Sequence, residues 1–176
     1  MNSPSWDLFI IIFLAVATGY GFILQKEKAA ATLISTYIAL VVTSVWGDSV
    51  YNLLVGKTVL FNQVWFSSHL NPFSVKIIIF GLLIVLLSLK GEYISSRTGT
   101  IGSAVLLFLF SFLNAGLIIS SIISFMDEVS RTTLLTQSHV AALIFKYNSW
   151  WIALPAIILI VAGFRKKTQT QTEQSS

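Results

Sequence analysis

Three polar residues in the longest apolar segment are candidates for lining a solute path. Asn114 lies near the middle of residues 101–126, and Ser111 and Ser121 fall on the same helical face. Polar side chains inside a membrane helix are costly, so they mark candidate functional positions. The structural alternative is a hydrogen bond from Asn114 to a neighbouring helix, worth about 1 kcal/mol or less. Because no charged residue accompanies Asn114 in this segment, the sequence favours the helix-packing interpretation.

Two histidines and two adjacent acids are the other residues with metal-binding or acid–base chemistry. Apart from the neighbouring Asp127 and Glu128, no two of them have ligand spacing on one element, which leaves His69 and His139 as ordinary loop residues. The chain has no cysteine, and it has no nucleophile elbow, phosphate loop or zinc-protease motif. The sequence therefore predicts no catalytic residue, no metal or cofactor site and no enzymatic activity.

Small residues at four-residue spacing form the most regular pattern in the chain. Ala15 and Gly19, and likewise Ala17 and Gly21, place small stripes on the first apolar segment. In lipid such stripes let helix backbones approach closely. The pattern predicts self-association or association with other membrane proteins. The candidate helix-packing residues are Gly19, Gly21, Gly99, Gly102, Asn114, Gly116, Ser120 and Ser124.

The composition requires most of these residues to lie in a lipid bilayer. Hydrophobic residues make up 55% of the 176 and charged residues only 10%, against about 25% charged in a soluble domain. A membrane-spanning helix needs roughly 20 apolar residues. We therefore predict an all-α, polytopic transmembrane bundle over residues 1–164 and a polar, basic tail over 165–176, with no nucleic-acid partner. The predicted spans are about 7–24, 29–55, 72–90, 100–126 and 141–164.

Two boundaries of this bundle carry local signals. Asn71 and Pro72 predict a helix start, with Asn71 as the cap and Pro72 in the first turn. Ser138 is a predicted cap before an apolar stretch. The segment 134–148 fits a short helix on the membrane surface as well as it fits an extension of the fifth span. Five spans are therefore predicted, with four as the alternative.

The basic residues predict the orientation. With five spans, seven Lys and Arg fall on one side and four on the other, and the richer side faces the cytoplasm. This places the N-terminus outside and the C-terminus in the cytoplasm of a multi-pass inner-membrane protein. Asp48 lies 20 residues after Lys28, or about 30 Å along a helix, which puts its carboxylate at the outer edge of the bilayer. A four-span chain would reverse the loops.

Between about residues 5 and 146 the sequence resembles the colicin V production protein family of bacterial membrane proteins. The resemblance rests on an acidic residue that opens the first helix, a Gly-Tyr and Gly-Phe element before a charged stretch, an Arg and Gly entry into the fourth helix, and a later serine. These positions are Asp7, residues 19–22 and 26–28, Arg97, Gly99, Gly102 and Ser138.

The resemblance implies an inner-membrane protein linked to toxin production or secretion and to envelope homeostasis. It implies no cofactor and no established enzymatic activity. We therefore predict a non-enzymatic accessory or scaffold protein that acts through helix association. The alternative is a small transporter or channel subunit that acts as an oligomer, with a path lined by Ser111, Asn114 and Ser121.

Overall fold

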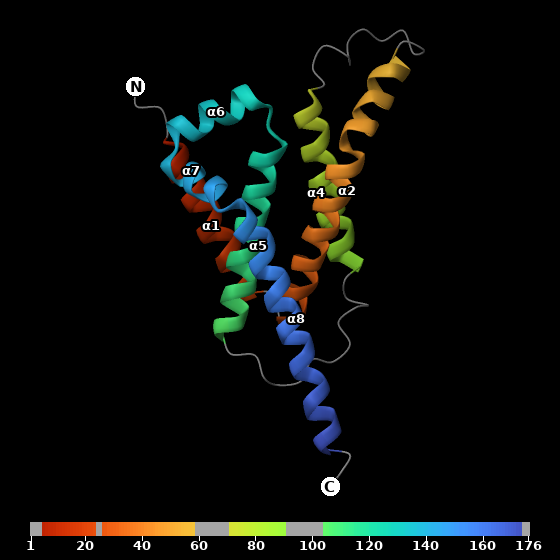
Figure 1. Ribbon diagram of the computed structural model, residues 1–176, viewed down its shortest axis with the longest axis vertical. Coiled ribbons are helices and arrows are strands. Elements are labelled where there is room, and N and C mark those ends of the chain that lie inside the picture. The colour runs from red at the N-terminus through yellow and green to blue at the C-terminus, as the bar shows by residue number, and fades with distance from the viewer. Residues whose placement is uncertain (1–4, 24–25, 59–70, 91–103, 174–176) are drawn as a thin grey trace.

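The computed structural model describes residues 5–23, 26–58, 71–90 and 104–173, and this part of the chain is entirely helical (Figure 1). The predicted all-α class is confirmed. Two predicted packing residues, Gly99 and Gly102, lie outside the described residues, as do Arg97 and His69. The helices are α1 (Trp6–Ile23), α2 (Lys26–Thr58), α4 (Pro72–Lys90), α5 (Ala104–Phe125), α6 (Glu128–Gln137), α7 (His139–Lys146) and α8 (Asn148–Glu173).

Three helices are long and apolar enough to cross a membrane, through the segments Lys28–Leu54, Pro72–Leu89 and Leu107–Phe125. The pair α7 and α8 also meets this criterion, but the two helices are bent by 58° relative to each other. In α1 the apolar stretch Trp6–Gly21 is shorter. The described residues therefore hold three candidate spans, or four if the bent pair is one span.

The break between α7 and α8 differs from the continuous segment 141–164 that the sequence indicates. Tyr147 has φ −101° and ψ 22° and ends α7, and α8 begins at the next residue. Tertiary contacts account for the separation, because α7 packs against both α1 and α5. Residues 134–137 end α6 and residues 139–146 form α7, which makes a candidate span only together with α8.

The central helix of the bundle is α5, which contacts α1, α2, α4, α7 and α8. The other extensive pairing joins α2 to α4, as Figure 1 shows on the right of the molecule. In the same view α1, α2, α4 and α5 run alternately down and up, and the bent pair α7–α8 runs down. The start of α1 and the end of α8 consequently lie at opposite ends of the molecule.

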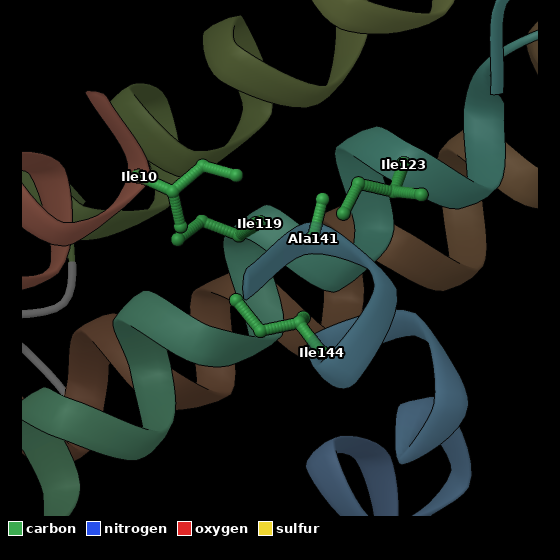
Figure 2. Packing of buried hydrophobic residues seen from close by; sticks show 5 residues of the cluster. All are labelled: Ile10, Ile119, Ile123, Ala141 and Ile144. Atoms are coloured by element: carbon green, nitrogen blue, oxygen red, sulfur yellow. The ribbon is translucent and has the colours of Figure 1, made fainter. Parts of the chain in front are cut away.

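One apolar cluster joins α1, α5 and α7. Figure 2 shows Ile10 of α1, Ile119 and Ile123 of α5, and Ala141 and Ile144 of α7 converging at this point. All five side chains are at most 7% exposed. The cluster fixes α7 against the bundle, where a helix of eight residues could not form alone.

A second apolar cluster joins α2 to α5 nearer the other end of the bundle. Ala29 and Leu33 of α2 are buried against Leu107, Phe110 and Leu117 of α5. Partly buried side chains of α8 pack onto the same cluster. Its burial positions the first turns of α2 beside α5.

Large apolar side chains cover the outside of the bundle. Val16 of α1 is 65% exposed, Val45 of α2 is 66%, and Ile78 and Leu89 of α4 are 61% and 71%. A soluble monomer rarely exposes contiguous apolar surface on this scale. Such a surface is typical of helices that face lipid.

The two predicted boundary signals are confirmed. The backbone N–H of Phe73 donates to Asn71 Oδ1 at 3.3 Å, and α4 begins at Pro72. Ser138 caps α7, because its hydroxyl accepts a hydrogen bond from the N–H of Ala141 at 3.0 Å. The helix α2 extends to Lys26 and Thr58, beyond the predicted 29–55, since charged residues are tolerated where a helix leaves the apolar region.

Candidate functional site

Asp7 joins the start of α1 to the start of α7. Its Oδ1 accepts hydrogen bonds from the Ser138 hydroxyl at 2.5 Å and from the Val140 N–H at 3.0 Å. Ser138 is fully buried and at the same time accepts from Ala141. The first N–H groups of a helix lack partners within it, and here α1 and the Ser138 cap supply them. This contact, which we name the α1–α7 joint, is the most complete polar arrangement that the structure describes.

Two further polar contacts attach α8 to the bundle. The hydroxyl of Ser120 in α5 donates to Asn148 Oδ1, and the hydroxyl of Tyr37 in α2 donates to the Ile152 carbonyl. Ser120 is fully buried. These bonds hold the first turns of α8 to two different helices. The predicted packing role of Ser120 therefore has a defined partner within the chain.

An ion pair connects α2 with α4. Lys76 Nζ lies 2.9 Å from Asp48 Oδ1, with Lys76 19% exposed and Asp48 64% exposed. Gly47 makes room for this pairing, because a Cβ there would lie 2.8 Å from Lys76 Cγ. The sequence places Asp48 at the outer edge of the bilayer, and the structure brings Lys76 of α4 into contact with it. Because its carboxylate is largely exposed, the pair contributes about 1 kcal/mol or less.

The predicted packing glycines divide into two groups. A Cβ at Gly21 would overlap the Ser111 side chain of α5, and a Cβ at Gly116 would overlap the Trp151 ring of α8. A Cβ at Gly19 would meet nothing within 4 Å. Gly21 and Gly116 are therefore close-packing positions within this chain, whereas Gly19 faces open space. Ser124 bonds back to the Ser120 carbonyl of its own helix at 2.8 Å.

Asn114 and Ser111 line a groove of about 540 Å³ between α1, α2, α4 and α5, which we name the α1–α4 groove. Ser121 does not line it and donates instead to the Leu117 carbonyl at 2.7 Å. Asn114 Oδ1 and Ser88 Oγ are buried and have no hydrogen-bond partner among the described residues. The expected hydrogen bond from Asn114 to a neighbouring helix is thus not made through this oxygen.

A second pocket, of about 590 Å³, lies between α1, α5 and α6. Its lining is mostly apolar, with Trp6 and Phe9 of α1, Ile123 of α5 and Leu134 of α6 among the contributing side chains. Phe73 at the start of α4 also reaches it. Among the described residues, the lining of this pocket holds no charged side chain.

The acids and histidines do not form a common centre in the part of the chain that is described. Asp127 caps α6, where its Oδ2 accepts from the Ser130 N–H at 2.9 Å. That hydrogen bond lowers the pKa of the Asp127 carboxyl below its usual value. His139 is exposed at the start of α7. Across residues 5–23, 26–58, 71–90 and 104–173, no group of three or more His, Asp or Glu is placed to hold a metal ion.

Sequence reasoning missed several of these contacts. The bond between Ser120 and Asn148 and the position of Trp151 against Gly116 depend on how α8 folds back onto α5. The available signal was Asn148 itself, since a polar residue near an apolar segment often bonds to another helix. Its partner cannot be read from spacing, because the two residues are on different helices.

Comparisons of the chain with protein-family models, with curated proteins and with solved structures find no match. The class of the protein is accordingly the one that its own fold defines. It is an all-helical chain with several apolar helices that could span a membrane.

Proposed function

We propose that this chain is a non-enzymatic, multi-pass protein of the inner membrane that serves as an accessory or scaffold in toxin production, secretion or envelope homeostasis. The observation that carries the proposal is how the polar side chains are used. Asp7, Ser120 and Asp48 each contact a different helix of the bundle, and none faces a shared reaction centre. Polar groups that join helices are expected in a packing module rather than in a catalyst.

Two contacts involve positions on which the resemblance to the colicin V production protein family rests. Asp7 and Ser138 are two of the positions on which that resemblance rests, and they are hydrogen-bonded to each other. Gly21 belongs to its Gly-Phe element and lies directly against Ser111 of α5. Asp7, Ser138 and Gly21 thus share a structural task, which is to seat α1 against α5 and α7.

The proposed topology has five crossings, formed by α1, α2, α4, α5 and the α7–α8 pair. With 18 residues α1 is about 27 Å long, at the short end of the range of roughly 17–25 residues found in spanning helices. The alternating helix directions in Figure 1 support an odd number of crossings. In this topology the start of α1 faces outside and the end of α8 faces the cytoplasm, as the distribution of Lys and Arg favours.

The surface of α4 that faces away from α2 is the best candidate for association with another helix. Ile78 and Leu82 are 61% and 54% exposed, and a Cβ added at Gly81 between them would meet nothing within 4 Å. A glycine on an exposed transmembrane face lets a partner helix approach closely. The structure leaves this space unfilled within the described residues.

Gentle detergent extraction followed by identification of co-purifying chains tests the scaffold proposal. The wild-type chain should co-purify with a second copy or with a defined membrane protein. Gly81→Leu should abolish that association, while Leu86→Ile on α4 should preserve it. A wild-type chain that purifies alone and as a monomer would contradict the scaffold role.

The second candidate is a small transporter or channel subunit acting as an oligomer. It is favoured by the position of Asn114 and Ser111 in the α1–α4 groove. Reconstitution into liposomes tests it through solute or ion flux. Flux abolished by Asn114→Leu but unchanged by Ser121→Ala, which lies off the groove, would establish this role in place of the scaffold.

A further inference from the structure

The α1–α4 groove has an apolar wall along most of its length. Ile84, Val85 and Leu89 of α4 form one side, and Ala17 of α1 and Ile118 of α5 form the opposite side. Val85 and Leu89 are 57% and 71% exposed, so the wall is open to the surroundings of the bundle. Surfaces of this kind in a membrane are covered by hydrocarbon.

One end of the groove is polar and cationic. Lys28 and Thr32 lie in the first turns of α2, and Tyr20 lies in the last turn of α1. Lys28 and Tyr20 are both exposed. The groove therefore combines a hydrocarbon-compatible wall with an ammonium group at the end where α1 finishes and α2 starts.

The volume of the groove indicates whether a helix or a single flexible acyl chain could occupy it. A spanning helix about 10 Å wide and 30 Å long displaces roughly 2,400 Å³, several times the 540 Å³ of the groove, so the groove cannot enclose such a helix. An extended acyl chain is far narrower and can follow the whole groove. At mid-depth the Ser111 hydroxyl donates to the Leu107 carbonyl at 2.8 Å, and Asn114 Oδ1 and Ser88 Oγ are buried, so these three polar atoms do not face the acyl chain.

We infer that the α1–α4 groove binds one anionic phospholipid, with an acyl chain along α4 and its phosphate at Lys28. This inference rests on the proposed membrane location. Basic positions between transmembrane helices near the cytoplasmic face attract anionic headgroups, and each Lys near the surface is worth about fivefold in affinity. A zwitterionic lipid fits the same wall but carries no net charge to match Lys28.

The test uses the full chain purified in detergent, with bound lipid counted by native mass spectrometry. When equal amounts of phosphatidylglycerol and phosphatidylcholine are offered, the wild type should retain one phosphatidylglycerol in about fivefold preference. Lys28→Gln should reduce that preference nearly to parity. Lys146→Gln removes the same charge from the exposed Lys146 side chain of α7 and should leave the preference intact.

A second variant tests the wall of the groove, and a competitor tests the source of the phosphate. Val85→Trp should displace both lipids, because the ring fills the groove. Inorganic phosphate should not compete, since it lacks the acyl chain.

Equal retention of the two lipids by the wild type, or an unchanged preference in Lys28→Gln, would overturn the inference. So would displacement of the lipid by inorganic phosphate alone. If Val85→Trp fails to fold, the two lysine variants decide, because both side chains are exposed. Native mass spectrometry counts lipids on the purified chain and does not require a protein partner. A chain that binds phosphatidylglycerol but co-purifies with no protein would therefore contradict only the scaffold role.

Discussion

Asp7 at the start of α1 and Ser138 at the start of α7 are 131 residues apart in the chain and hydrogen-bonded at 2.5 Å. The same carboxylate oxygen accepts from the Val140 N–H. Since α7 is only eight residues long, its stability depends on the rest of the protein. The backbone N–H groups at its N-terminus need hydrogen-bond acceptors, and its apolar face needs to be buried against other helices. The α1–α7 joint satisfies the donors, and the cluster around Ile10 and Ala141 buries the apolar face.

Ser138→Ala should destabilise the protein, because it removes the cap of α7 and the donor to Asp7. Loss of a helix N-cap typically costs about 0.5–2 kcal/mol. Thermal or chemical unfolding in detergent measures the change. Ser149→Ala, at an exposed serine in the first turn of α8, is the matched control and should have little effect. Equal stability of the two variants would argue against the joint.

Gly21→Ala should be more damaging than Gly19→Ala, although the two positions are only two residues apart. The added methyl at Gly21 overlaps Ser111, whereas the one at Gly19 meets open space. Overpacking of this kind typically costs about 1–3 kcal/mol. The same unfolding measurement, made on both variants, checks the order. A Gly19 variant that is the less stable of the two would mean that α1 packs through another face.

The cap of α6 predicts a pH dependence at the acid end. The hydrogen bond from the Ser130 N–H lowers the pKa of Asp127 below the usual 3.8. The carboxylate therefore stabilises α6 at all pH values above about 3.8, and this contribution is lost as the pH falls through the lower, folded-state pKa. Amide hydrogen exchange in α6, corrected for intrinsic rates, should accelerate in that window.

Asp127→Asn provides the comparison, since asparagine also caps helices but does not titrate. In this variant the hydrogen exchange of the α6 amides, corrected for intrinsic rates, should not accelerate below pH 3.8 as it does in the wild type. Identical exchange profiles for the two chains would show that Asp127 does not control the stability of α6.

The sequence correctly predicted those structural features that a local signal determines. The all-helical class follows from apolar segments that are too long and too continuous for strands, and the starts of α4 and α7 follow from Asn71–Pro72 and Ser138. The packing of Gly21 and Gly116 also agrees with the small-residue stripes. The helical class and the two helix starts depend on residues within one turn of each other or on backbone spacing alone, whereas the partners of Gly21 and Gly116 lie on other helices.

The remaining features depend on contacts between distant helices. Nothing near Tyr147 predicts a 58° break, and Pro155, the proline within α8, lies two turns further on. The break follows from α7 being held to α1 and α5 while Asn148 bonds to Ser120. The pairing of Asp48 with Lys76 likewise arises because α2 and α4 lie side by side.

The most direct test of the central claim is the topology of the chain in its membrane. Because the sequence contains no cysteine, single cysteines can be placed at Ser5, at Ser130 in α6 and at Thr168 in α8, and labelled with a membrane-impermeant maleimide in spheroplasts. Five crossings predict that Ser5→Cys and Ser130→Cys react at once, whereas Thr168→Cys reacts only after permeabilisation. Labelling of Ser5→Cys and Thr168→Cys from the same side would contradict an odd number of crossings and the orientation proposed for every helix.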